Sequence, residues 1–390
     1  MLKNLTGYLL WAALVQAAYA APYIPGSPNQ VLEKLPATTD ASIQRFKSLR
    51  SRLASDPNNI ELAVKLTKLY IEQSRDEGDP RYLGYAQAAL APWWELDQPP
   101  IDILVLRATL LQSTHQFDES LADLNRVLKL DRANGQAWLT RATILQVQGK
   151  YAEALQSCEQ LYALTSELVT LTCSLNVRNL NGRAKDSYQE LKVALEQTPD
   201  TDPNIQIWVL TLLAEMAERL GDVVAAEKHF ENAINLGDPD SYLLGVYSDF
   251  LLEQHRPQEV LSLLKAKTTI DPLLLRYAEA LNAMHLPESQ VQIEELRNRF
   301  DAAMMRGDTV HQREQSRFEL RLMHNPVRAL EIAKLNWAIQ KEPADARVYL
   351  EAALASSDKY AAVPLIGWLE AHHLEDAILK KMIDHHKGAI

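Results

Sequence analysis

The sequence repeats itself at intervals of about 34 residues, and this period constrains the fold more than any other feature. The offset superimposes two runs, Leu104-x-x-Arg107-Ala108-x-x-Leu111 and Trp138-x-x-Arg141-Ala142-x-x-Leu145. It also pairs Phe117 with Tyr151 and Leu124 with Cys158. A unit of this length cannot bury its own apolar faces, so the repeat predicts a stack of units that stabilise their neighbours.

The composition and the clearest repeat indicate that each unit is a pair of helices. Only 13 of the 390 residues are glycine, whereas the strong helix formers Ala, Leu, Glu and Gln are abundant. Residues 212–240 read LLAEMAERLGDVVAAEKHFENAINLGDPD, with Gly221, Ala226 and Phe230 at marked positions. The pattern W-x-x-L-G-x-x-Y, then A-x-x-x-F, then Pro is that of the tetratricopeptide repeat (TPR), and the chain resembles this family.

The resemblance implies an all-α fold, a right-handed superhelical TPR-like solenoid of stacked helix-turn-helix units. A different helical repeat built on the same two-helix unit is the alternative. Small residues such as Ala154 and Ala226 are expected where the two helices of a unit cross most closely. Gly149 and Gly221 are expected to end the first helix in the left-handed conformation, which glycine adopts without strain.

The chain divides into five segments by composition. Residues 1–20 have a signal-peptide pattern: Lys3, an apolar run over residues 7–15, and Ala18-Tyr19-Ala20 as a small-x-small cleavage site. Residues 21–39 form a Pro-rich tether, and residues 40–57 an N-terminal capping helix. Residues 58–272 carry the TPR-like repeats, and residues 273–390 carry divergent C-terminal helical repeats and a cap. An uncleaved membrane anchor is the alternative for the first segment.

The segment pattern and the charge predict an exported protein, with the periplasm as its compartment. The net charge of −11 repels phosphate backbones and so disfavours nucleic acid as a partner. No stretch beyond the signal reaches the roughly 20 apolar residues that a membrane span needs. An oxidising compartment permits a disulfide between Cys158 and Cys173, and two buried thiols are the alternative.

The sequence holds no motif that predicts catalysis. It lacks the glycine-rich nucleotide loops, the G-x-S-x-G elbow and the HExxH zinc pattern. The pairs His372-His373 and His385-His386 lack the spacing of helical metal ligands, so a solvated helix is expected there, with weak adventitious zinc or nickel binding as the alternative. We therefore expect no enzyme activity, no cofactor and no metal site.

The resemblance also implies a binding surface, because the first helix of each TPR unit lines the concave face. Its recurring positions hold hydroxyl and amide side chains at one end of the stripe and carboxylates with aromatics at the other. These stripe residues are Thr109, Gln112, Thr143, Gln146, Asn176, Asn179, Trp208, Glu215, Glu218, Tyr242 and Asp249. Amides can grip an extended backbone, and carboxylates favour basic partners. A merely solvated face is the alternative.

These observations favour a scaffold or adaptor of the cell envelope that binds a protein or extended peptide, basic in character, on its concave surface. An accessory or assembly factor for a secreted or haem-bearing enzyme complex is a second hypothesis, which rests on analogy of fold. An enzyme with a site in the C-terminal third is a third, and no group of residues supports it.

Overall fold

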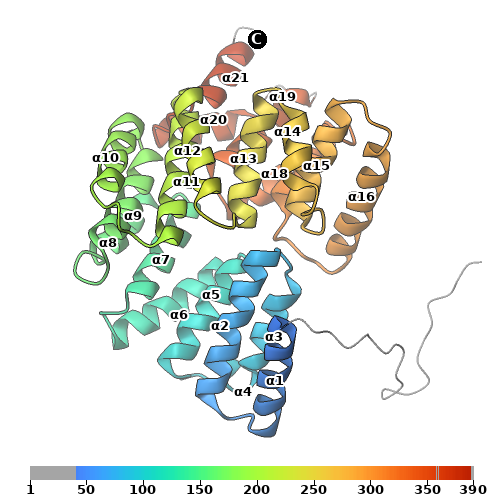
Figure 1. Ribbon diagram of the computed structural model, residues 1–390. Coiled ribbons are helices and arrows are strands. Elements are labelled where there is room, and N and C mark those ends of the chain that lie inside the picture. Colours follow the sequence, from blue (N-terminus) through green and yellow to red (C-terminus); the bar gives the residue numbers. More distant parts are fainter. Residues whose placement is uncertain (1–40, 357, 359, 388–390) are drawn as a thin grey trace, which may run out of the picture. The chain divides into compact units, whose positions relative to one another are not determined.

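The computed structural model describes residues 41–356, 358 and 360–387 (Figure 1). The expected signal peptide and Pro-rich tether lie outside the described residues. Residues 1–48 and 49–390 form separate units, and the architecture given below is that of residues 49–390. The part of the chain that is described contains helices α1 to α21 and no strand, which confirms the all-α prediction. None of its helices has the length and apolar character of a membrane span.

The helices form consecutive hairpins from near residue 60 to the C-terminal region, so the divergent last third continues the repeat. We call the first helix of each hairpin the A helix and the second the B helix. The hairpins are α2 (Ile60–Glu77) with α3 (Arg81–Ala89), α5 (Ile101–Ser113) with α6 (Phe117–Leu130), α7 (Gly135–Val147) with α8 (Tyr151–Glu159), α9 (Glu167–Asn179) with α10 (Ala184–Glu196), α11 (Pro203–Arg219) with α12 (Val223–Asn235), α13 (Ser241–Glu253) with α14 (Pro257–Leu264), α15 (Asp271–Ala283) with α16 (Ser289–Met305), α17 (Gln312–Arg321) with α18 (Pro326–Ile339), and α19 (Pro343–Ala355) with α20 (Val363–Ala371). Helices α1 (Ala41–Ser55), α4 (Ala91–Trp94) and α21 (Ala377–Lys387) are additional. This is the TPR-type architecture that the resemblance implied.

Small residues lie at the helix crossings, as the repeat predicted. Ala154 and Ala226 are fully buried, and Phe230 fills the space between successive hairpins against Tyr247 and Phe250. Because such interiors are close-packed, the alanines set how near the two helices of a hairpin approach each other.

Residues of two types, glycine and histidine, have a left-handed backbone at the turns between A and B helices from α2 to α18, and a histidine has it between α20 and α21. Gly149 and Gly221 have φ of 73° and 79°, which confirms the predicted role of both glycines. Every non-glycine residue with positive φ in the described part of the chain is a histidine, with φ between 52° and 58°: His115, His255, His285, His324 and His373. A side chain at such a position costs roughly 1–2 kcal/mol, so histidine replaces glycine here against a local preference.

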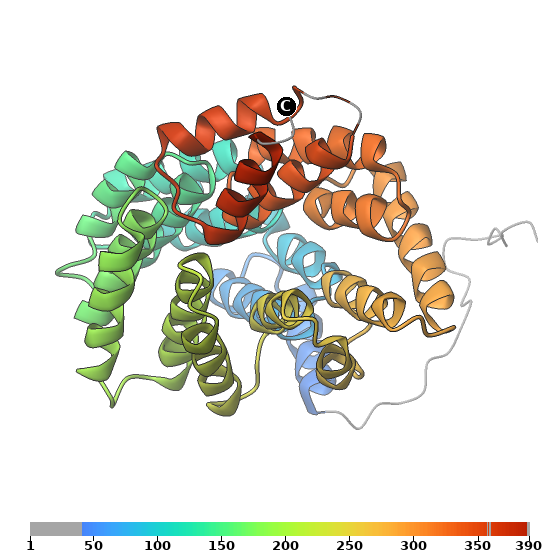
Figure 2. The same cartoon turned by 90° about the horizontal axis from the view of Figure 1, so that it is seen from above.

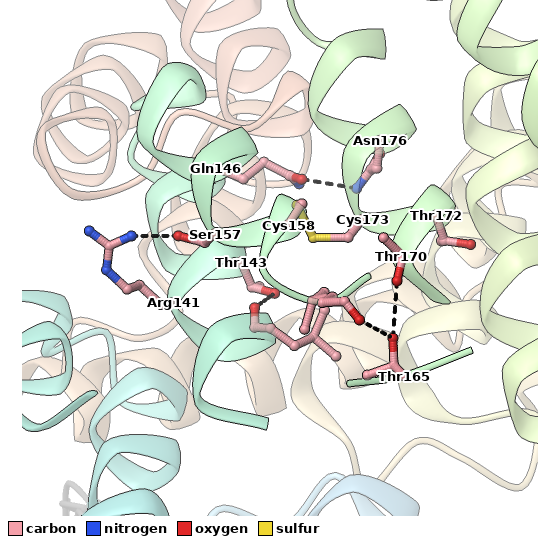
Figure 3. The surroundings of a disulfide bond; sticks show 12 residues. Arg141, Thr143, Gln146, Ser157, Cys158, Thr165, Thr170, Thr172, Cys173 and Asn176 are labelled. Atoms are coloured by element: carbon pink, nitrogen blue, oxygen red, sulfur yellow. Dashed lines mark hydrogen bonds between the residues drawn. A yellow bond between two sulfur atoms is a disulfide. The ribbon is translucent and has the colours of Figure 1, made fainter. Parts of the chain in front are cut away.

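A disulfide joins Cys158 of α8 to Cys173 of α9, with 5.6 Å between the Cα atoms (Figure 3). It links the B helix of one hairpin to the A helix of the next. Both cysteines are buried within the apolar layer between these hairpins. Of the two states left open by the sequence, the structure has the disulfide.

The C-terminal segment lies across the turns of three consecutive middle hairpins, which Figure 2 shows as red helices beside the teal and green ones. Trp368 packs at Gly149, His373 at Gly182 and Ala377 at Gly221. Backbone contacts reinforce this docking: the Lys341 N–H donates to the Val147 carbonyl over 2.7 Å, and the Ala184 N–H donates to the Glu375 carboxylate over 2.7 Å. The last hairpins therefore contact the middle of the array.

Gly149→Ala should destabilise the protein, because the new Cβ atom would lie 2.7 Å from Trp368 and the backbone has a positive φ. Left-handed strain alone contributes roughly 1–2 kcal/mol. Urea denaturation would measure the loss. Gly367→Ala is the matched control, since no atom lies within 4 Å of its Cβ position and it sits within a helix. Equal stability of the two variants would contradict the docking of Trp368 on this turn.

Candidate functional site

A polar bridge joins each consecutive pair of A helices from α7 to α19, and we call the series the polar ladder. Its first rung is the hydrogen bond from Asn176 to Gln146, visible in Figure 3. The rungs, with their donor–acceptor distances, are Asn176–Gln146 (3.2 Å), Arg219–Asn179 (2.6 Å), Tyr242–Glu215 (2.9 Å), Arg276–Asp249 (2.6 Å), Arg317–Glu279 (2.6 Å) and Arg321–Glu351 (2.7 Å). The ladder begins with amides and ends with ion pairs.

Many of the predicted stripe residues belong to this ladder: Gln146, Asn176, Asn179, Glu215, Tyr242 and Asp249. The sequence reasoning thus found side chains that the structure brings together on successive A helices. Two rungs join stripe residues to each other, Asn176 to Gln146 and Tyr242 to Glu215, whereas the arginine partners of Asn179 and Asp249 were not predicted. The stripe residues outside the ladder divide into three kinds. The hydroxyls of Thr109 and Thr143 donate to carbonyls of their own helices. Gln112 and Trp208 are half-buried, and Glu218 lines a cavity.

Stripe residues from both halves are engaged within the chain and are not freely exposed. Asn179 is fully buried, donates to the Ala184 carbonyl and accepts from Arg219. The Asp249 carboxylate accepts from both Arg276 and Arg317, each over 2.6 Å. Reversing the charge at Asp249 would therefore disrupt the fold, because the guanidinium groups of Arg276 and Arg317 would lose their anion.

The partners that were not predicted are Arg219 of α11, Arg276 of α15 and Arg317 of α17, and arginines repeat every fourth residue on α17. Arg313, Arg317 and Arg321 occupy one face of that helix, since residues four apart are neighbours. Arg317 is largely buried and makes a bidentate pair with Glu279, while Arg321 pairs with Glu351. The run REQSRFELR was the available signal, but this part of the chain matches the TPR pattern only loosely.

Two joined cavities lie beside the ladder. The inner cavity, of about 170 Å³, is lined by α11, α13, α15, α17 and α19 together with the start of α21. The outer cavity, of about 600 Å³, lies between the α11–α12 turn, α13, α19 and α21. Glu218, Glu253, Arg347 and Ile378 line both cavities, so they mark the place where the two meet.

The carboxylates around the inner cavity differ sharply in their electrostatics. Burial alone would raise the pKa of Asp249, but the guanidinium groups of Arg276 and Arg317 hold it well below its usual range. Glu218 makes no hydrogen bond and no ion pair within the described part of the chain, and burial raises its pKa to about 8. Burial also raises the pKa of Glu215. The nearby guanidinium groups of Arg347 and Arg219 lower the pKa of Glu218 by less than burial raises it.

Two of the described histidines, His229 and His372, make contacts with aromatic side chains. His229 lies 3.0 Å from the Tyr188 hydroxyl, and burial lowers the pKa of this imidazole to about 4. Both side chains are buried, which fits a structural contact rather than a proton-transfer pair. His372 stacks on Trp368 with 4.0 Å between the ring centroids. Across the described residues, no group of three or more His, Cys, Asp or Glu side chains could hold a metal ion.

Comparison with known proteins gives similarity at the level of structure alone. No protein-family model and no curated protein sequence matches the chain. A tetratricopeptide repeat protein from Parabacteroides merdae has 16% identity and a TM-score of 0.42, over 66% of this chain and 91% of that chain. The human IFIT1 dimer with PPP-AAAA has 14% identity and a TM-score of 0.47, over 81% of this chain and 79% of that chain. No function is transferred at these values.

Arg317→Met should lower the free energy of unfolding by about 3 kcal/mol, because it leaves buried carboxylates without their cation. Arg328→Met is the control, since the ion pair of Arg328 with Glu331 is exposed. A pair of that kind contributes about 0–1 kcal/mol. Urea denaturation of the two variants would measure the difference. Similar losses in both would contradict the role of Arg317 in the ladder.

Glu218→Gln should stabilise the protein at high pH. The pKa of Glu218 is higher in the folded chain than in the unfolded chain, so unfolding releases a proton between about pH 4.5 and pH 8. Stability contributed by this group is therefore present at low pH and lost across that window. One pKa unit corresponds to about 1.4 kcal/mol. Allowing for residual contact with water, we expect a gain on the order of 2 kcal/mol at pH 9 and little change at pH 4.

Denaturation at both pH values checks this expectation. Glu190→Gln is the control, because Glu190 is exposed on α10 and lines neither cavity. The same pH dependence in both variants would show that Glu218 is not buried as an unmatched carboxyl group.

Proposed function

We propose that the chain is a non-catalytic scaffold of the cell envelope that binds a protein partner at the outer cavity. The observation that supports this most directly is the recess itself, which is lined by side chains of several hairpins. Scaffolds built from repeats use surfaces assembled from neighbouring units in this way. The net charge of −11 disfavours nucleic acid as the partner.

Ion pairs within the chain occupy much of the inner face, and the recess lies beside them. The arginines of α15, α17 and α19 engage the carboxylates of α13, α15 and α19, so these groups are already matched within the chain. At the outer cavity, apolar side chains of Val223, Ile378 and Met382 lie beside the polar Gln254. A mixed apolar and polar recess of this kind suits a partner's side chains.

The proposed export rests on the N-terminal sequence and is supported by the disulfide. A bond between Cys158 and Cys173 persists in oxidising compartments and is rare in the cytosol. The mature chain is proposed to begin at Ala21, after the small-x-small site at Ala18 to Ala20. The disulfide is therefore consistent with the proposed compartment.

A photoreactive residue placed at Gln254 should cross-link the partner in envelope extracts, because Gln254 lines the outer cavity. The same residue placed at Val193 is the control, since Val193 is exposed on α10 and lines neither cavity. Mass spectrometry would identify the cross-linked protein. Equal cross-linking from both positions, or from neither, would contradict the proposed docking site.

Replacing Cys158 and Cys173 by serine should lower the free energy of unfolding by about 3 kcal/mol, the value expected for a closed loop of about 15 residues. The loop here spans a sequence separation of 15. Urea denaturation of the mature chain would measure the loss. Thiol alkylation of protein from the envelope fraction should label neither cysteine, and labelling of both would contradict export to an oxidising compartment.

A further inference from the structure

The first hairpin of the array has a groove beside it where later hairpins have a neighbour. The A helices α5, α7, α9, α11, α13 and α15 each contact both helices of the hairpin before them. In the described part of the chain only one helix, α1, precedes α2. A groove of about 380 Å³ lies between the end of α1 and the helices α2, α3 and α4, at the blue end of the array in Figure 1. An end hairpin without a full neighbour leaves apolar surface to be covered.

The lining of this groove is apolar and partly aromatic. Tyr70 is buried, whereas Tyr85 has 45% of its surface exposed, and the centroids of their rings lie 5.7 Å apart. Tyrosine is enriched at protein interfaces, where it supplies a large contact area. The small side chain of Ala88 is exposed in the groove and leaves room above the helix α3. The other principal lining residues are Leu53, Leu66 and Pro92.

The charge at the groove is positive, in contrast to the net charge of −11. Arg50 is the one charged group among the described residues that line the groove, and its guanidinium makes no hydrogen bond or ion pair within the described part of the chain. Arg52 is also exposed, and residues 49–55 contain no acidic residue. The carboxylate of Asp56, the next acidic residue, accepts from Asn59 instead. Complementary charge favours a partner that brings a carboxylate to this edge.

We propose that this groove binds an amphipathic helix of a protein partner, with its apolar side chains against Tyr85 and Ala88 and a carboxylate at Arg50. A helix fits because two helices cover each of the A helices named above, and a docked helix would give α2 its second one. Such helices insert apolar residues spaced three or four apart into a groove. The groove shares no lining residue with the outer cavity, so this inference does not depend on the function proposed there.

A synthetic peptide tests the charge and the shape of the groove together. The probe has about 15 residues, enough for a short helix, with leucine at helical spacing on one face and glutamate and alanine elsewhere. Fluorescence anisotropy would measure its binding to the mature chain in about 0.15 M salt, where charges more than about 8 Å away are screened. We expect it to bind about fivefold more tightly than a version with lysine in place of glutamate. A scrambled peptide of the same composition should not bind.

Variants of the groove give the matched comparison. Ala88→Glu should abolish binding of the glutamate peptide, because it places a carboxylate in the apolar groove. Gln87→Glu is the control, since Gln87 is the exposed neighbour on α3 and does not line the groove. Arg50→Gln should weaken binding of the glutamate peptide about fivefold and leave the lysine peptide unchanged. Circular dichroism would show that the variants keep the helical fold.

Several results would overturn the inference. They are absence of binding, equal affinity for the glutamate and lysine peptides, and equal binding by Ala88→Glu and the parent. Dimers of the mature chain that Ala88→Glu dissociates would assign the groove to a second copy. Peptide binding that appears only after Leu32 and Leu35 are replaced by serine would assign it to the chain's own N-terminal segment, and either assignment would exclude the partner helix. Cross-linking from Gln254 should be the same in Ala88→Glu and the parent, so failure here leaves the scaffold proposal standing.

Discussion

Buried pairs between arginine and carboxylate hold successive A helices in register, and the inner surface of the array depends on them. The apolar layers of leucine and alanine are non-directional, so they favour packing without fixing how each hairpin rotates on the next. The bidentate contact between Arg317 and Glu279 is directional, since the planar fork fits a carboxylate in few orientations. Buried ion pairs add little net stability because desolvation opposes them. Their contribution here is to define geometry.

This geometry changes what the inner face can do. A stripe of carboxylates on the A helices would ordinarily present negative charge to a basic partner. Here Asp249 and Glu279 face Arg317 of the same chain, so α17 fills the place that a partner's basic segment would take. Within the described residues the carboxylates therefore differ, because Asp249 and Glu279 are paired with arginine whereas Glu218 makes no hydrogen bond or ion pair.

The fold could be predicted from the sequence further than the site could. Ala226 and Gly149 belong to a local pattern, because each acts within one hairpin, and a period of about 34 residues reveals them. The rungs of the ladder join residues roughly one repeat apart, such as Arg276 with Asp249, and depend on how adjacent hairpins rotate. That rotation is a property of the packed array. The carboxylates were therefore predictable as inner-face residues, whereas their arginine partners in the loosely matching C-terminal third were not.

Glycine at a turn has two separate causes in this chain, a left-handed φ and a lack of space for a Cβ atom. A left-handed φ alone does not require glycine here, since histidines such as His255 and His285 adopt it at equivalent turns. Gly149 and Gly182 have a second constraint, because a Cβ atom would lie 2.7 Å from Trp368 and 3.1 Å from His373 respectively. Glycine at these two turns therefore reflects the close approach of the C-terminal segment more than the backbone angle. The glycines in the turns of the middle hairpins thus leave the space into which the last helices dock.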